Sequence, residues 1–209
     1  MNSIIKAFIA PIFCAGIFAG CSTSDVTRAI AEHNDGDFVT AEDIYNAMLD
    51  VNPNDKVALL NKGVTHSVRG NNEEALEAYN KIIEDVDDDY APAYNNRGVV
   101  YYKQENYNAA VADYNKALEI DDDYASALVN RGWVCYDFEQ YNGAIADANL
   151  ALERDDDFYA AYQLRGESQE ALGNTDAAIE DYKKAYKENE DYLPAQNKLR
   201  EHGIDPETI

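Results

Sequence analysis

A repeated spacing of 34 residues constrains this chain more than any other feature of its sequence. Asp87, Asp121 and Asp155 each open a run of three aspartates, and successive runs begin 34 residues apart. The step from Ala75 to Ala110 is 35 residues, so we place one added residue in the segment EDVDDDY. Such a period predicts stacked structural repeats that share one continuous core. Three columns keep this spacing: Gly63, Gly98, Gly132 and Gly166; Ala41, Ala75, Ala110, Ala144 and Ala178; and Tyr45, Tyr79, Tyr114, Ala148 and Tyr182.

Within one repeat, the small and aromatic residues recur at the spacing of a helix. Tyr94, Gly98 and Tyr101 lie about one turn apart, and Ala110 and Tyr114 resume the pattern after a break. This pattern predicts two helices joined by a short turn. The small residues would allow the two backbones to approach closely, and the tyrosines would fill the space beside them.

These columns resemble the tetratricopeptide repeat (TPR) family, whose unit is a 34-residue helix–turn–helix. The resemblance implies an all-α fold, a right-handed superhelical solenoid of five units within residues 25–192. Residues 193–209 would add a capping helix and tail, because repeat arrays need a polar end. The predicted units are 22–55, 56–90, 91–124, 125–158 and 159–192.

The aspartate runs fall in the turns between predicted hairpins. There they could cap the incoming helix and sit favourably at its positive end. Alternatively, stacking could align them as an acidic ridge that attracts a basic partner or loosely holds divalent cations. No run has the glycine and distal glutamate of an EF-hand loop, which argues against a specific calcium site.

The first 20 residues read as an export signal, with one cation, Lys6, before an apolar run too short to span a bilayer. The segment Phe18-Ala19-Gly20-Cys21 resembles the bacterial lipobox, which implies that Cys21 carries lipid. Residues 21–24 would then be the lipidated N-terminus and a short tether. We therefore expect a lipid anchor in the bacterial cell envelope, and Ser22 favours the outer membrane, facing the periplasm, by the same resemblance.

Composition restricts the partners. The chain has 40 acidic and 17 basic residues, a formal net charge of −23. This charge opposes binding to nucleic acid and to an anionic bilayer through the protein surface. A neutral or basic protein or peptide is the expected partner, with no cofactor and no small-molecule substrate. After loss of the signal and lipidation, Cys135 would be the one thiol left, predicted to be a small core residue.

In TPR proteins the first helix of each unit lines the concave face, which implies a peptide-binding groove here. Asn61, Asn96 and Asn130 form a column whose amides would bind a peptide backbone. Nearby on the same helices, Val99, Tyr102, Trp133 and Tyr136 are candidate hot-spot residues. The alternatives are that the asparagines make local helix contacts and that the rings pack between hairpins. A carboxylate clamp for acidic tails is disfavoured, because its lysine positions hold Val57, Pro92 and Ser126.

Arginines in one column are each followed 16 residues later by an aspartate: Arg97 and Asp113, Arg131 and Asp147, Arg165 and Asp181. We predict ion pairs within each hairpin, worth about 1 kcal/mol or less each if exposed. The second unit has Lys62 and Ala78 at these positions, so it should lack the pair.

Catalytic motifs are absent from the sequence. His33, His66 and His202 have no metal-binding spacing, and neither a phosphate-binding glycine loop nor a nucleophile elbow occurs. We therefore expect a non-enzymatic, lipid-anchored adaptor that binds an envelope protein. The alternative is an assembly factor for a pilus or outer-membrane machine.

Overall fold

The computed structural model of the protein describes residues 23–209, and every regular element within them is helical. These residues form two compact units, 23–120 and 121–209. The all-α fold of paired helices is confirmed. None of the described helices is both long and apolar enough to cross a membrane. The predicted signal sequence and the proposed lipidation site, Cys21, lie outside the described residues.

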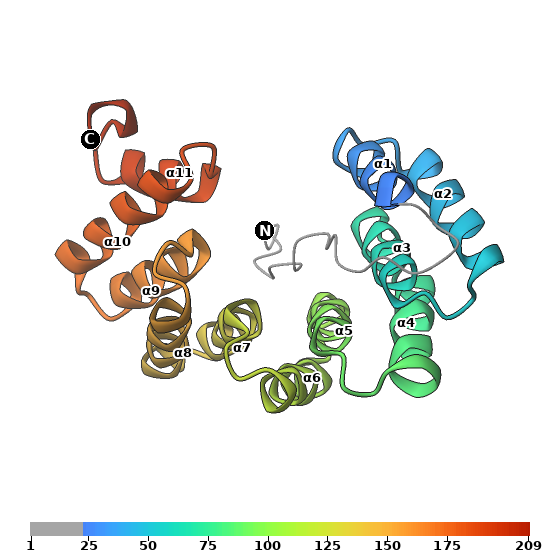
Figure 1. Ribbon diagram of the computed structural model, residues 1–209. Coiled ribbons are helices and arrows are strands. Elements are labelled where there is room, and N and C mark those ends of the chain that lie inside the picture. Colours follow the sequence, from blue (N-terminus) through green and yellow to red (C-terminus); the bar gives the residue numbers. More distant parts are fainter. Residues whose placement is uncertain (1–22) are drawn as a thin grey trace. The chain divides into compact units, whose positions relative to one another are not determined.

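Ten α-helices within residues 23–209 pair as five hairpins, and further short helices follow the fourth and the tenth (Figure 1). The unit 23–120 contains α1 (Thr23–Asn34) with α2 (Phe38–Val51), α3 (Lys56–Arg69) with α4 (Asn72–Lys81) and the π-helical η1 (Ile82–Val86), and α5 (Ala91–Lys103) with α6 (Tyr107–Ile120). The unit 121–209 contains α7 (Ala125–Asp137) with α8 (Tyr141–Arg154), α9 (Tyr159–Ala171) with α10 (Thr175–Glu188), α11 (Leu193–Glu201) and the 3₁₀ helix η2 (Pro206–Thr208).

The glycine and tyrosine columns meet inside each hairpin, as their spacing predicts. A Cβ atom added to Gly98 would lie 2.7 Å from the ring of Tyr114 and 3.2 Å from the carbonyl oxygen of Ala110. Tyr114 is completely buried. Gly63 and Gly166 have the same relation to Tyr79 and Tyr182. The backbone of these glycines is ordinary helix, so glycine is required here to make space for the ring and not for its backbone conformation.

The fourth hairpin lacks the tyrosine, and a leucine from the next hairpin fills the space. Ala148 stands at the tyrosine position of α8. The Cδ2 atom of Leu164, on α9, lies 2.6 Å from the place where a Cβ on Gly132 would be. Leu164 is fully buried, so the loss of the large ring is compensated within the core.

The added residue of the second repeat is accommodated by a π-helical turn. The segment η1 continues α4, and the backbone N–H of Asp87 donates to the carbonyl oxygen of Ile82, five residues earlier, at 2.7 Å. A π-helical turn absorbs one extra residue without breaking the helix. The step of 35 residues therefore leaves Ile82 in the core.

The predicted capping role of the aspartate runs is wrong. Helices α5, α7 and α9 begin after Tyr90, Tyr124 and Phe158, and none of these starts has a side-chain cap. Instead, the first aspartate of each run accepts a hydrogen bond from the backbone N–H of the third, at 3.2 to 3.3 Å. This Asx turn shapes the connection itself, because the short carboxylate reaches its own backbone sooner than the next helix.

The predicted arginine–aspartate pairs are confirmed, and they are more buried than expected. Arg97 donates to both carboxylate oxygens of Asp113 at 2.8 Å. The two side chains are only 16% and 8% exposed. Arg131 with Asp147 and Arg165 with Asp181 repeat this bidentate geometry. Bidentate contact strengthens such a pair, and because both groups are largely buried, removal of one partner would leave a poorly solvated charge.

Two of these arginines also join neighbouring hairpins. Arg97 donates through Nη1 to Asn80 Oδ1 at 2.7 Å, and Arg165 donates in the same way to Asn149. Each guanidinium therefore connects the second helix of the preceding hairpin with its own hairpin. Sequence reasoning predicted the pair within the hairpin and missed this connection, although the asparagines stand 17 and 16 residues before their arginines.

Helix α11 is attached to the last hairpin through Glu170 on α9. This carboxylate accepts hydrogen bonds from Tyr182 and Lys198 at 2.8 Å, and His202 Nε2 lies 2.9 Å from its other oxygen. Burial alone would raise the pKa of Glu170, but the hydrogen bonds from Lys198 and Tyr182 outweigh it and lower the pKa. The carboxylate is therefore held in its charged form. Helix α11 contributes its buried Leu199 to the core of the last hairpin.

Candidate functional site

The asparagine column is buried. The exposed fractions of Asn61, Asn96 and Asn130 are 0%, 2% and 1%. Asn61 has no hydrogen-bond partner for either side-chain polar atom among the described residues. The Oδ1 atom of Asn96 accepts from Asn95 at 3.1 Å. A peptide could reach these amides only after neighbouring side chains move, so their role in binding stays a prediction.

The fifth hairpin shows where this column points. Leu164 occupies the asparagine position there, and its side chain packs toward Gly132 of the preceding hairpin. The column thus faces the contact between successive hairpins in that unit of the chain. This placement favours the packing alternative for the asparagines.

The candidate hot-spot residues divide into a buried pair and an accessible pair. Val99 and Trp133 are buried, whereas Tyr102 and Tyr136 are half-buried. Tyr102 packs edge-on against Tyr107, with ring centroids 5.7 Å apart. These aromatic contacts stabilise the hairpins and leave part of each tyrosine open to a partner. The predicted binding role of all four residues is not tested by their placement.

Tyr136 lies in a similar aromatic group on the other unit. Its ring centroid is 5.4 Å from those of both Trp133 and Tyr141, again edge-on. Burial, with a contribution from Glu167, raises the pKa of Tyr136 to about 12. Its hydroxyl therefore stays protonated at neutral pH and can donate a hydrogen bond.

Lys103 adds a cation beside Tyr102 on α5. Its Nζ donates to the carbonyl oxygen of Ser67 at 3.1 Å and to the Ser67 hydroxyl at 2.9 Å, which joins α5 to the end of α3. Burial lowers the pKa of Lys103. A half-buried cation of this kind can stabilise a carbonyl group of a bound segment. Its position was visible in the sequence, but the contact that holds it was not.

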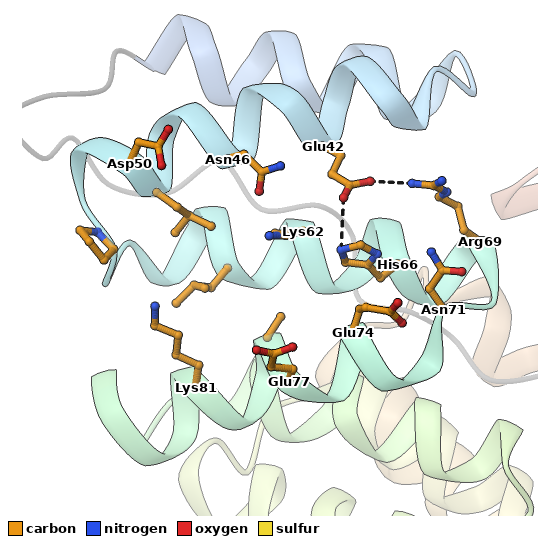
Figure 2. Close-up of a pocket in the computed structure, with 14 residues that line it drawn as sticks. Glu42, Asn46, Asp50, Lys62, His66, Arg69, Asn71, Glu74, Glu77 and Lys81 are labelled. Carbon is orange, nitrogen blue, oxygen red and sulfur yellow. Dashed lines mark hydrogen bonds and ion pairs between the residues drawn. The ribbon is translucent and has the colours of Figure 1, made fainter.

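A groove of about 640 Å³ lies beside the second hairpin, at α2, α3 and α4 (Figure 2). Its residues include Glu42, which accepts from Arg69 at 2.6 Å and lies 3.7 Å from His66 Nε2. Lys62 and Ala78, where the arginine–aspartate pair is missing, also line it. Sequence reasoning identified this missing pair and did not anticipate a groove.

Features of a catalytic site do not come together in the described residues. No three His, Cys, Asp or Glu side chains between residues 23 and 209 are arranged to hold a metal ion. Burial raises the pKa of the Cys135 thiol, and its Sγ lies 3.5 Å from where a Cβ on Gly143 would be. The raised pKa disfavours the thiolate, which is the nucleophilic form.

Comparison with known proteins places the chain among repeat proteins. Models described as "Tetratricopeptide repeat" match residues 26–92, 91–124 and 159–192. A probable UDP-N-acetylglucosamine–peptide N-acetylglucosaminyltransferase SPINDLY of Hordeum vulgare is 33% identical over 91 residues, 40% of this chain and 10% of that protein. The chain thus spans a tenth or less of the length of the curated relatives it matches.

Two solved structures share the helical architecture. A thermophilic TPR protein from Thermus thermophilus aligns with a TM-score of 0.74 at 21% identity, covering 85% of this chain and 96% of that one. The first TPR of Spaghetti (RPAP3), bound to the HSP90 peptide SRMEEVD, aligns with a TM-score of 0.52 at 27% identity, covering 56% and 94%. Since the repeat models together match more than half of its residues, the chain belongs to the tetratricopeptide repeat family.

Proposed function

We propose that this protein is a non-enzymatic TPR adaptor, anchored by lipid on Cys21 in the bacterial cell envelope, that binds a peptide segment of an envelope protein. The family and the peptide-bound relative support a protein-interaction scaffold. The observation that carries the proposal is that each unit has a half-buried tyrosine on the first helix of a hairpin, Tyr102 on α5 and Tyr136 on α7. Rigid aromatic side chains that are partly open are typical anchors for a partner.

The chemistry of the partner follows from charge. The peptide-bound relative holds an acidic HSP90 segment. This chain has Val57, Pro92 and Ser126 at the positions expected for a carboxylate clamp, and its net charge is −23. A neutral or basic segment suits such a surface better, because an acidic one would be repelled on approach.

Partner capture from solubilised envelope tests this proposal. We expect wild-type protein to retain a specific envelope protein, and the Tyr102→Ala, Tyr136→Ala double variant to lose about tenfold in affinity or more. Lys183→Ala, at an exposed site on α10, is the matched control. Equal capture by the double variant, with far-UV circular dichroism unchanged, would exclude these tyrosines as anchors.

The anchor has its own test. Wild-type chain should incorporate radiolabelled palmitate, and Cys21→Ser should not. Label that persists in Cys21→Ser would refute lipidation at that residue. The identity of the captured protein separates the adaptor from the assembly factor: a cell-wall enzyme supports the first, and secretin or pilin subunits support the second.

A further inference from the structure

The arginine bridges provide an internal template for the seam between hairpins. In two seams, an asparagine of the preceding hairpin, an arginine and an aspartate form one hydrogen-bonded set: Asn80, Arg97 and Asp113, and Asn149, Arg165 and Asp181. The seam between the first and second hairpins has Asn46, Lys62 and Ala78 at the same positions. The amide and the cation are retained there, and the carboxylate is missing.

At this departure from the repeat, the surroundings do not fill the space. The first hairpin also lacks the carboxylate, with Arg28 and Ile44 at these positions, but there Arg28 lies 3.8 Å from Glu32. The added residue near Asp87 is absorbed by η1, and the missing tyrosine at Ala148 is replaced by Leu164. At Ala78, in contrast, a cavity of about 640 Å³ remains. Among residues 23–209, no carboxylate lies within ion-pair distance of Lys62.

The groove has a basic floor and mixed, mainly acidic walls. Figure 2 shows Lys62 and His66 on α3, between Asn46 and Asp50 on one side and Glu77 and Lys81 on the other. Glu42, Arg69 and His66 already have partners, because Glu42 contacts both of the other two side chains. The charged groups that remain without an ion-pair partner in the described chain are Lys62, Lys81, Asp50, Glu74 and Glu77.

We propose that this groove binds a small zwitterionic ligand, whose carboxylate meets Lys62 in the place of the missing aspartate. The asparagine amide of Asn46 can donate to the same carboxylate. A cationic group of the ligand then meets Asp50 or Glu77 on the walls. A ligand with both charges suits the site better than a simple anion, because the unpaired wall carboxylates and the net charge of −23 repel an anion.

The size of the groove agrees with such a ligand, since pockets for small molecules enclose roughly 300–1,000 Å³. A free amino acid and the C-terminal residue of a peptide both carry the required carboxylate and cation. This site lies apart from Tyr102 and Tyr136 in the sequence and does not depend on the proposed adaptor function.

Titration calorimetry of the wild-type chain with L-arginine, agmatine and pentanoate tests the proposal. Agmatine is arginine without its carboxylate, and pentanoate has no cation. We expect L-arginine to bind more tightly than either. Lys62→Met keeps the aliphatic stem and removes the charge. It should weaken L-arginine about tenfold or more and should not weaken agmatine, which has no carboxylate for Lys62 to meet.

A second variant closes the site. Ala78→Asp restores the carboxylate of the template beside Lys62, and it should abolish L-arginine binding without loss of helical content. Lys183→Met on α10 is the matched control and should bind like wild type. If glycyl-L-arginine binds better than L-arginine, the carboxylate belongs to a peptide C-terminus. If the two bind equally, a free amino acid is the ligand.

Three results would overturn the proposal. The first is no binding of L-arginine at concentrations up to about 10 mM, a range that detects even weak complexes. The second is equal affinity of L-arginine for wild type and Lys62→Met. The third is full binding by a folded Ala78→Asp variant. If Ala78→Asp fails to fold, Lys62→Met decides the outcome alone.

Discussion

Truncation of Asp113 tests how much an arginine bridge stabilises the array. Asp113→Ala leaves the guanidinium of Arg97 largely buried, with a hydrogen bond to Asn80 and the rings of Tyr94 and Tyr101 beside it. Removing one partner of a fully buried pair costs about 3–5 kcal/mol, and partial access of Arg97 to water reduces this to roughly 2–3 kcal/mol. The double variant Arg97→Met, Asp113→Ala removes both charges and should recover about 1 kcal/mol or more of that loss.

Hydrogen exchange of the amides in α5 and α6 is the appropriate assay. Repeat arrays open locally, so a single global unfolding free energy does not describe them well. In Asp113→Ala, the amides of α5 and α6 should exchange faster by the factor that corresponds to the lost free energy. Urea unfolding followed by far-UV circular dichroism should show a midpoint at a lower urea concentration.

An exposed pair in the same chain is the control. Lys183 and Glu180 form an ion pair three residues apart on α10, with side chains 36% and 68% exposed. Its removal by Glu180→Ala should cost about 0.5 kcal/mol or less. Two results would contradict this reasoning: Asp113→Ala costs no more than Glu180→Ala, or the double variant loses as much as Asp113→Ala and Arg97→Met lose separately. In either case the Arg97–Asp113 pair does not stabilise the array.

Three further predictions concern the core and the cap. Gly98→Ala should destabilise the fold by about 1–3 kcal/mol in thermal unfolding, because the added Cβ would lie 2.7 Å from Tyr114. The control Gly143→Ala, where the nearest atom would lie at 3.5 Å, should be neutral or stabilising. Leu164→Ala should cost about 2–5 kcal/mol, and Ala148→Tyr added to it should recover part of this loss by refilling the space; no recovery would contradict the compensation. Folding lowers the pKa of Glu170, so its ionised carboxylate stabilises the fold above the usual carboxyl pKa of 4.5, and this stabilisation is lost as the pH falls below that value. Hydrogen exchange in α11 should therefore accelerate in acid for the wild type and depend less on pH in Glu170→Gln.

Periodicity predicted the helices well, because each column reports a packing requirement that recurs at every turn of the array. The spacing of Gly98 from Tyr114, and of Arg97 from Asp113, gave contacts that the structure confirms. The aspartate runs were misread as helix caps. A run of aspartates offers its carboxylates to several backbone donors, and which N–H is nearest depends on the turn geometry, which the spacing does not specify.

The candidate site was harder to predict, since accessibility depends on what neighbouring hairpins cover. Asn96 and Tyr102 lie on the same helix, yet one is buried and the other half-buried. A helical pattern identifies the face on which a residue lies but not how closely the next hairpin covers that face. The repeat spacing therefore makes Asn96 a candidate binding residue. Whether a partner can reach it depends on how the neighbouring hairpin packs.

Departures from the repeat are more informative than the repeat itself once the structure is known. In a stack of similar hairpins, neighbours of a substituted position have a limited set of responses: a backbone adjustment, a compensating side chain or an unfilled space. The first occurs at η1 and the second at Leu164. The third occurs at Ala78, where the carboxylate that Asp113 and Asp181 supply in other hairpins is missing and a groove of about 640 Å³ lies beside Lys62. The open position beside Lys62, a cation with no carboxylate partner among the described residues, is the reason we propose a ligand there.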